Sequence, residues 1–137
     1  MRGRLLALVF VFLAVSPAGC GKATKAGPPP TPSCTPSGTA LQIVAKDIRF
    51  STDCLAMKAN TPFTVAFENQ DAGVVHNFAI HTGHWMYSVA APWLFMGEDV
   101  TGTAATTYQV AGLAPGTYVF MCDIHHDQMT GHFLVTP

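Results

Sequence analysis

The stretch YVFMCDIHHDQMTGHFLV, residues 118 to 135, contains two strand-like segments joined by a short connection. In the first segment Tyr118, Phe120 and Cys122 alternate with other residues, so they share one face of a strand. In the second segment Phe133 and Val135 alternate in the same way. The pattern predicts two core strands, with a connection between them that is rich in sulfur and imidazole side chains.

The remainder of the chain has the pattern of an all-β protein. Short apolar or alternating segments are separated by turn clusters such as NQDAG (69–73) and AGLAPG (111–116), and no segment keeps a helical period. Residues 82–103 show no clear pattern, and we expect a strand, a short helical turn and a loop there. The predicted strands are 41–45, 47–50, 63–68, 74–81, 106–110, 116–122 and 132–136. Short strands at this spacing predict an antiparallel Greek-key β-sandwich or barrel over residues 41–137.

The N-terminus has the pattern of an export signal. Residues 1–20, MRGRLLALVFVFLAVSPAGC, contain two arginines, an apolar run and then small residues. The AGC at 18–20 is similar to the end of a bacterial lipobox, although Pro17 stands where that pattern usually has leucine. We expect a lipoprotein signal peptide over 1–19 with lipidation of Cys20; ordinary cleavage after Ala18 is the alternative. Residues 20–40 are rich in Pro, Gly, Ser and Thr and are expected to form a disordered tether.

The charge of the body excludes one class of partner. From Cys34 onward three basic residues face all eight acidic ones, which leaves a formal charge of −5 with histidine neutral. Nucleic-acid binding depends on clustered lysine and arginine, so we expect no nucleic-acid partner.

The four cysteines divide into three roles. Cys20 is assigned to lipidation, and export makes a disulfide between Cys34 and Cys54 possible. A disulfide over a loop of this size stabilises by roughly 3 kcal/mol in the chain-entropy model. Cys122 is then left unpaired beside two histidines, which argues for a chemical role.

The connection after Cys122 carries donor atoms that suit one metal. Cys122, His125 and Met129 lie within it, and His76 shares the inward parity of Phe78 on another predicted strand. Thiolate and thioether are soft donors and imidazole is borderline, and this set suits copper in both of its oxidation states. Structural zinc rarely uses methionine, and magnesium and calcium prefer oxygen.

These motifs resemble those of the cupredoxins, near the small plastocyanin-like type. The resemblance covers residues 41–137 and is carried by HN at 76–77, GTYVFMC at 116–122 and the Cys-x2-His-x3-Met spacing. It implies a Greek-key β-barrel and one type 1 copper ion bound by His76, Cys122, His125 and Met129. It also implies that hydrogen bonds of Asn77 tie the His76 strand to the Cys122 loop.

The remaining histidines are assigned away from this site. His126 is interpreted as the bystander beside His125, because related loops often have proline there, although it could bind if His125 were displaced. His132 has outward parity and is expected to be a solvated strand residue. His81 and His84 could form a second, weak surface site, but we favour polar loop residues.

The resemblance implies a one-electron carrier rather than an enzyme. We expect it to work outside the cytoplasmic membrane, as a monomer held by a lipid anchor, with redox proteins as partners. The alternative is an extracytoplasmic protein that binds or delivers copper. The chain is too short for the additional domains of multicopper oxidases and nitrite reductases, and it lacks the further histidines of a trinuclear site.

Overall fold

The computed structural model describes residues 33–83 and 92–137. The predicted signal peptide (1–19), Cys20, the tether up to residue 32 and His84 lie outside the described residues. Within the described part there is no helix, and so none that could cross a membrane.

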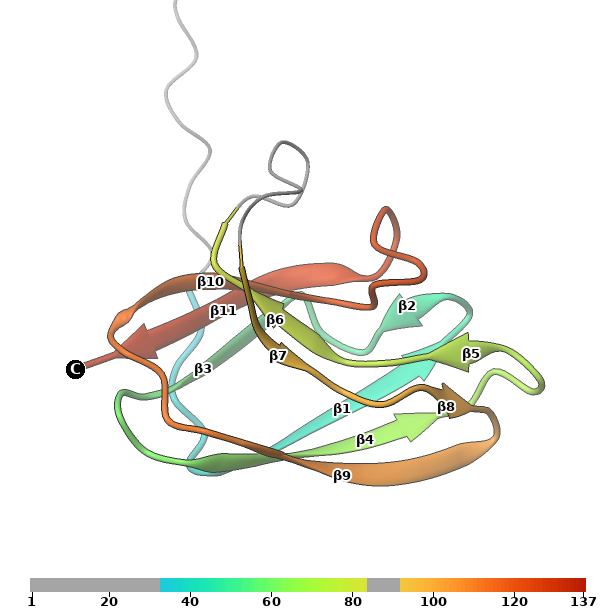
Figure 1. The fold of residues 1–137 in the computed structure, drawn as a ribbon, viewed down its shortest axis with the longest axis horizontal. Coiled ribbons are helices and arrows are strands. Elements are labelled where there is room, and N and C mark those ends of the chain that lie inside the picture. The colour runs from blue at the N-terminus through green and yellow to red at the C-terminus, as the bar shows by residue number, and fades with distance from the viewer. Residues whose placement is uncertain (1–32, 84–91) are drawn as a thin grey trace, which may run out of the picture. The chain divides into compact units, whose positions relative to one another are not determined.

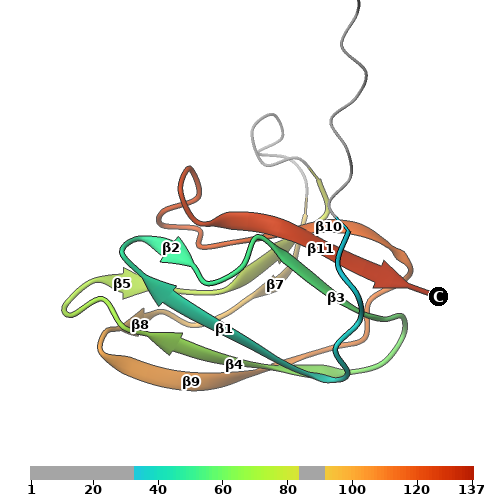
Figure 2. The same ribbon diagram turned by 180° about the vertical axis from the view of Figure 1, so that it is seen from behind.

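Two β-sheets form the domain (Figure 1). The first sheet has the order β2 (Arg49–Phe50), β1 (Ala40–Lys46), β4 (Phe63–Asn69), β9 (Ala104–Val110). The second has the order β3 (Cys54–Lys58), β11 (Thr130–Thr136), β10 (Gly116–Met121), β6 (Ala79–His81), β7 (Trp93–Met96). A separate pair consists of β5 (Val75–His76) and β8 (Val100–Thr101). In both views β1, β4 and β9 lie along one side and β10 and β11 along the other (Figures 1 and 2).

The predicted all-β sandwich is confirmed, but the expectation that its strands are all antiparallel is wrong. The pairs β1–β4 and β3–β11 run parallel, whereas the other strand pairs are antiparallel. Side chains alternate with a period of two in both kinds of pairing, so the pattern of residues predicts a strand but not its direction relative to a neighbour.

The core lies between the two sheets. In β4, Phe63, Val65 and Phe67 are buried as the alternation predicts. Phe78 and Phe120 stack with ring centroids 5.7 Å apart, and Phe63 lies 5.5 Å from the ring of Phe133. A fully buried phenylalanine stabilises a fold by about 1.5–3 kcal/mol, and the contact of Phe63 in β4 with Phe133 in β11 joins the two sheets.

Several local predictions differ from the structure. The predicted strand 47–50 is a strand only at Arg49–Phe50, because Asp47 and Ile48 form a turn in which both have φ of 53°. The predicted strand 74–81 is divided into β5 and β6. Strand β3 was not predicted, and β7 lies in the region that had no clear pattern.

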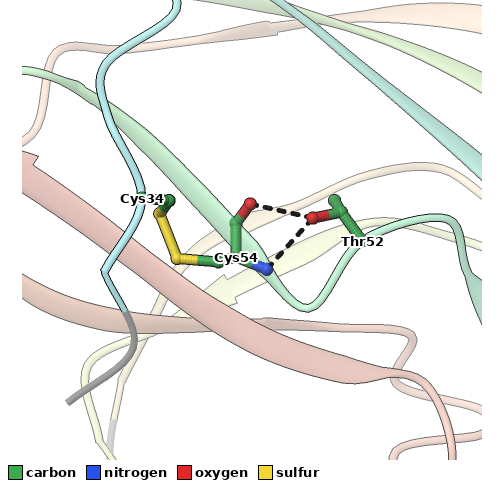
Figure 3. The surroundings of a disulfide bond; sticks show 3 residues. All are labelled: Cys34, Thr52 and Cys54. Atoms are coloured by element: carbon green, nitrogen blue, oxygen red, sulfur yellow. Dashed lines mark hydrogen bonds between the residues drawn. A yellow bond between two sulfur atoms is a disulfide. The ribbon is translucent and has the colours of Figure 1, made fainter.

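A disulfide joins Cys34 to Cys54 (Figure 3). Cys54 begins β3, and the hydroxyl of Thr52 both donates to its carbonyl and accepts from its amide, at 3.0 and 3.2 Å. The amide of Ser37 also donates to the carbonyl of Ala56. The exposed segment that precedes β1 is therefore tied to the edge strand of the opposite sheet.

Candidate metal centre

The connection between β10 and β11 is closed by its own backbone. The amide of Cys122 donates to the carbonyl of Met129 at 3.0 Å, directly beyond the last strand pair, Met121 with Thr130. The amides of Gln128 and Met129 both donate to the carbonyl of His125, at 3.0 and 2.8 Å. These bonds fold the loop back on itself, so its first and last donor residues are held side by side.

The structure brings three predicted donors from two parts of the chain to one point. The Sγ of Cys122 lies 3.9 Å from Nδ1 of His76 and 3.8 Å from Nδ1 of His125, and the two Nδ1 atoms are 3.1 Å apart. These are the only described His, Cys, Asp or Glu residues that form a group able to hold a metal ion. Met129 is fully buried in the same core cluster as Cys122.

The spacing of the donors fits a metal ion. A triangle with these three sides has its centre about 2.1 Å from each corner, which is the length of a metal–nitrogen bond and slightly less than that of a metal–sulfur bond. His76 and Cys122 are completely buried, and His125 reaches partly to the surface. Two imidazoles and a thiolate with a thioether nearby are donors that suit copper.

A carboxylate lies behind the buried histidine. The Nε2 atom of His76 is 2.9 Å from Oδ2 of Asp71, on the side of the ring away from Cys122. The pKa of Asp71 is lowered, first by the hydrogen bond from the amide of Ile48 and further by those from His76 and the amide of Asp47. Asp71 was not singled out from the sequence, where it stands in the turn cluster NQDAG; the only signal was an acidic residue five positions before His76.

Asn77 connects the strand of His76 to the loop of Cys122. Its Oδ1 accepts from the amide of Asp123 at 3.1 Å, and its Nδ2 donates to the carboxylates of Asp123 and Asp99. Asn77 itself is only 1% exposed, whereas Asp123 is half-buried and Asp99 is exposed. The arrangement has the form that the family resemblance implies for this residue.

The other histidines that the structure describes, at positions 81, 126 and 132, lie outside the donor group. The ring of His126 is exposed, with Nδ1 at 3.0 Å from Oδ1 of Asp127. His132 is a half-buried residue of β11. The interpretation of His81 as a polar loop residue is wrong: it ends β6, is 5% exposed and meets Trp93 edge-on with ring centroids 4.9 Å apart. His81 lies between β10 and β7 in the sheet, opposite Val119 and Trp93, and the pairing with β7 had no signal in the sequence.

A buried phenol completes the surroundings of the core beside this site. The hydroxyl of Tyr108 donates to the carbonyl of Glu98 at 2.7 Å. Burial, and to a lesser extent the carboxylate of Asp99, raise the pKa of Tyr108. The phenol therefore stays neutral and keeps its hydrogen bond over the physiological range of pH.

The described residues form a β-sandwich in which a strand and a loop distant in sequence bring together soft donors that suit a metal ion. The model of the cupredoxin-like domain matches residues 5–135, and the chain belongs to the cupredoxin family. No curated protein is similar enough in sequence to count as a match.

Solved structures agree with this assignment of the fold. An auracyanin from Roseiflexus castenholzii is 20% identical, with a TM-score of 0.62, over 72% of this chain and 98% of that one. Auracyanin A, a blue copper protein from Chloroflexus aurantiacus, is 18% identical, with a TM-score of 0.64, over 72% and 99%. A copper-containing nitrite reductase from Thermus scotoductus is 19% identical, with a TM-score of 0.50, over 71% of this chain but 22% of that one.

Proposed function

We propose that this cupredoxin is a type 1 blue copper protein that carries single electrons. The observation that carries the proposal is the triangle formed by two Nδ1 atoms and the Sγ of Cys122. A trigonal set of two histidines and one cysteine with a weak axial methionine is the ligand set of blue copper electron-transfer sites. His76, Cys122 and His125 would be the equatorial ligands and Met129 the axial one.

A bound copper ion supplies reversible one-electron chemistry, and the chain supplies the frame around it. Cys122 and Met129 are held together by a backbone hydrogen bond, and His76 lies in a paired strand. Side chains held in this way change position little when the charge of the site changes, which favours fast electron transfer. His125 is the one ligand of the triangle that reaches the surface, so its ring is the proposed route for the electron.

The proposed role is a carrier and not an enzyme. Cys122 and Met129 belong to the buried core cluster, and His125 is the one partly exposed member of the donor group, which supports electron transfer through this ring rather than binding of a substrate at the site. The likeness to a nitrite reductase covers about a fifth of that protein and concerns the fold only.

The proposed location is outside the cytoplasmic membrane of a bacterium, with an acylated Cys20 as the anchor. The disulfide between Cys34 and Cys54 supports an oxidising compartment, and the N-terminal sequence supports export. Two or more acyl chains give stable attachment to a membrane. We propose redox proteins as partners and a monomeric chain as the working unit.

The first experiment is to load the protein with Cu(II) and record its visible spectrum and voltammogram. We expect the intense band of a Cu(II)–thiolate bond and a reversible one-electron wave. Cys122→Ser should remove the band, because the charge transfer requires sulfur. A band that survives in this variant would refute the proposal; rapid loss of copper to an acceptor without a reversible wave would favour copper delivery instead.

A matched pair of variants separates the two adjacent histidines. His125→Ala should open the site to external imidazole or lose copper, whereas His126→Ala should keep the spectrum, because the ring of His126 lies outside the donor triangle. Met129→Leu should leave the protein coloured and raise its reduction potential, since the axial ligand tunes that potential. The opposite result for the two histidines would refute the ligand assignment.

A further inference from the structure

Asp71 is held by donors from two parts of the chain. Its Oδ2 accepts from Nε2 of His76 at 2.9 Å and from the amide of Ile48 at 3.0 Å, and its Oδ1 accepts from the amide of Asp47 at 2.6 Å. Its own amide donates to Oδ1 of the buried Asn69 at 2.9 Å. The side chain of Asp71 is 12% exposed and that of His76 is 0% exposed. The carboxylate of Asp71 is thus fixed in place beside the imidazole ring of His76, which water does not reach.

The turn that holds Asp71 is unusual in its backbone. Asp47 and Ile48 both have φ of 53°, a conformation that L-residues adopt rarely and that costs of order 1 kcal/mol or more at each position. Successive amides in such a turn form a concave site for an anion. Both amides point to the two oxygens of Asp71, so the turn between β1 and β2 is shaped around this carboxylate.

The contact with Asp71 also determines which nitrogen of His76 carries the proton. An ionised carboxylate only accepts hydrogen bonds, so Nε2 of His76 must be the donor. The lone pair of the neutral ring is then on Nδ1, which faces the Nδ1 of His125 and the Sγ of Cys122. A histidine ligand whose second nitrogen donates to a carboxylate is held in one orientation and is a stronger electron donor.

We propose that Asp71 is a positioning residue of the metal centre: it selects the tautomer and direction of His76, and its charge favours Cu(II) over Cu(I). The proposal rests on the function proposed above. Negative charge close to a poorly solvated metal stabilises the more positive of the two oxidation states, because the interaction is weakly screened. The turn at Asp47 and Ile48 is thereby linked to the potential of the site through one carboxylate.

The test compares two aspartate-to-asparagine variants. Asp71→Asn keeps the size of the side chain and one accepting oxygen but removes the charge. The control is Asp127→Asn, which removes an equal charge from the exposed contact with the bystander His126. Loss of a partner behind a ligand commonly costs about 10-fold or more in metal affinity; a 10-fold loss confined to Cu(II) raises the potential by ~59 mV. We expect that shift in Asp71→Asn and no comparable shift in the control; equal potentials in wild type and Asp71→Asn would overturn the proposal.

A second measurement does not depend on copper, and its decisive part uses the wild-type protein alone. Nitrogen-15 NMR of the metal-free wild-type protein reports which ring nitrogen of His76 is protonated. We expect the proton on Nε2, in a hydrogen bond to Asp71, and a mixture of tautomers in Asp71→Asn. A proton on Nδ1 in the wild type would overturn the role proposed for Asp71, even if the copper-loaded protein is blue. If the proton is on Nε2 but the copper-loaded protein has no blue band, only the proposed function is refuted.

Discussion

Asn77→Ala is the substitution that tests most directly how the metal loop is held. Asn77 is 1% exposed and makes three hydrogen bonds with Asp99 and Asp123, besides a longer one from Nδ2 to the Sδ of Met96 at 3.8 Å. Its carbonyl oxygen accepts from the amide of Asp123, and its amide group donates to the carboxylates of Asp123 and Asp99. The methyl group of alanine can form none of these hydrogen bonds. In the variant the backbone amide of Asp123 and the carboxylates of Asp123 and Asp99 therefore each lose a hydrogen-bond partner.

The magnitude follows from the kind of each bond. A neutral hydrogen bond contributes about 0.5–1.5 kcal/mol and one to a charged group about 1.5–3 kcal/mol, so one of the first kind and two of the second give about 3.5–7.5 kcal/mol. Asp99 is exposed and Asp123 half-buried, so water can recover part of the carboxylate contribution. We therefore expect a loss of ~4 kcal/mol, which is a large share of the 5–15 kcal/mol typical of a domain.

The assay is urea unfolding of the metal-free protein with its disulfide intact. Gln109→Thr serves as the control, because Gln109 is an exposed residue of β9 and such surface changes usually stay within ~0.5 kcal/mol. In the copper-loaded protein Asn77→Ala should also alter the potential, since Asp123 directly follows Cys122. A loss of less than ~1 kcal/mol would show that the Cys122 loop is held by its own backbone bonds and not by Asn77.

Three further predictions concern stability. Replacing Cys34 and Cys54 by serine should lower the free energy of unfolding by about 3 kcal/mol, because the bridge spans 20 residues; a change below ~1 kcal/mol in urea unfolding would contradict this. Burial raises the pKa of Tyr108 above its usual 10.0, so the free energy of unfolding should be constant with respect to this group below pH 10 and should fall as the pH rises above 10. Urea unfolding at a series of pH values should show a weaker fall for Tyr108→Phe. Gly131→Ala would place Cβ against the ring of Phe120 and the backbone carbonyl oxygen of Asp53, and we expect a loss of about 1–3 kcal/mol; an unchanged midpoint would show that both neighbours move aside without cost.

Local patterns in the sequence were sufficient to predict the strands that face the core. The alternation of Phe63, Val65 and Phe67 predicts a half-buried strand because the side-chain period of a strand is two, and the structure confirms it. The proximity of Cys122 and Met129 could also be predicted locally. They lie at the two ends of one short connection, and the ends of a connection between two paired strands are neighbours in the sheet. The parallel pairings of β1 with β4 and of β3 with β11 had no such local signal.

The approach of distant segments was decided by the tertiary structure alone. His76 lies 46 positions before Cys122, and only the packing of β5 beside the β10–β11 loop brings its Nδ1 toward the thiol. The carboxylate of Asp71 meets His76 and the amides of Asp47 and Ile48 only after the β1–β2 turn has folded against the loop that follows β4. The edge-on contact of the buried His81 with Trp93 likewise depends on the pairing of β6 with β7. Periodicity reports which face of a strand is apolar, whereas contacts between strands far apart in sequence depend on how the whole core packs.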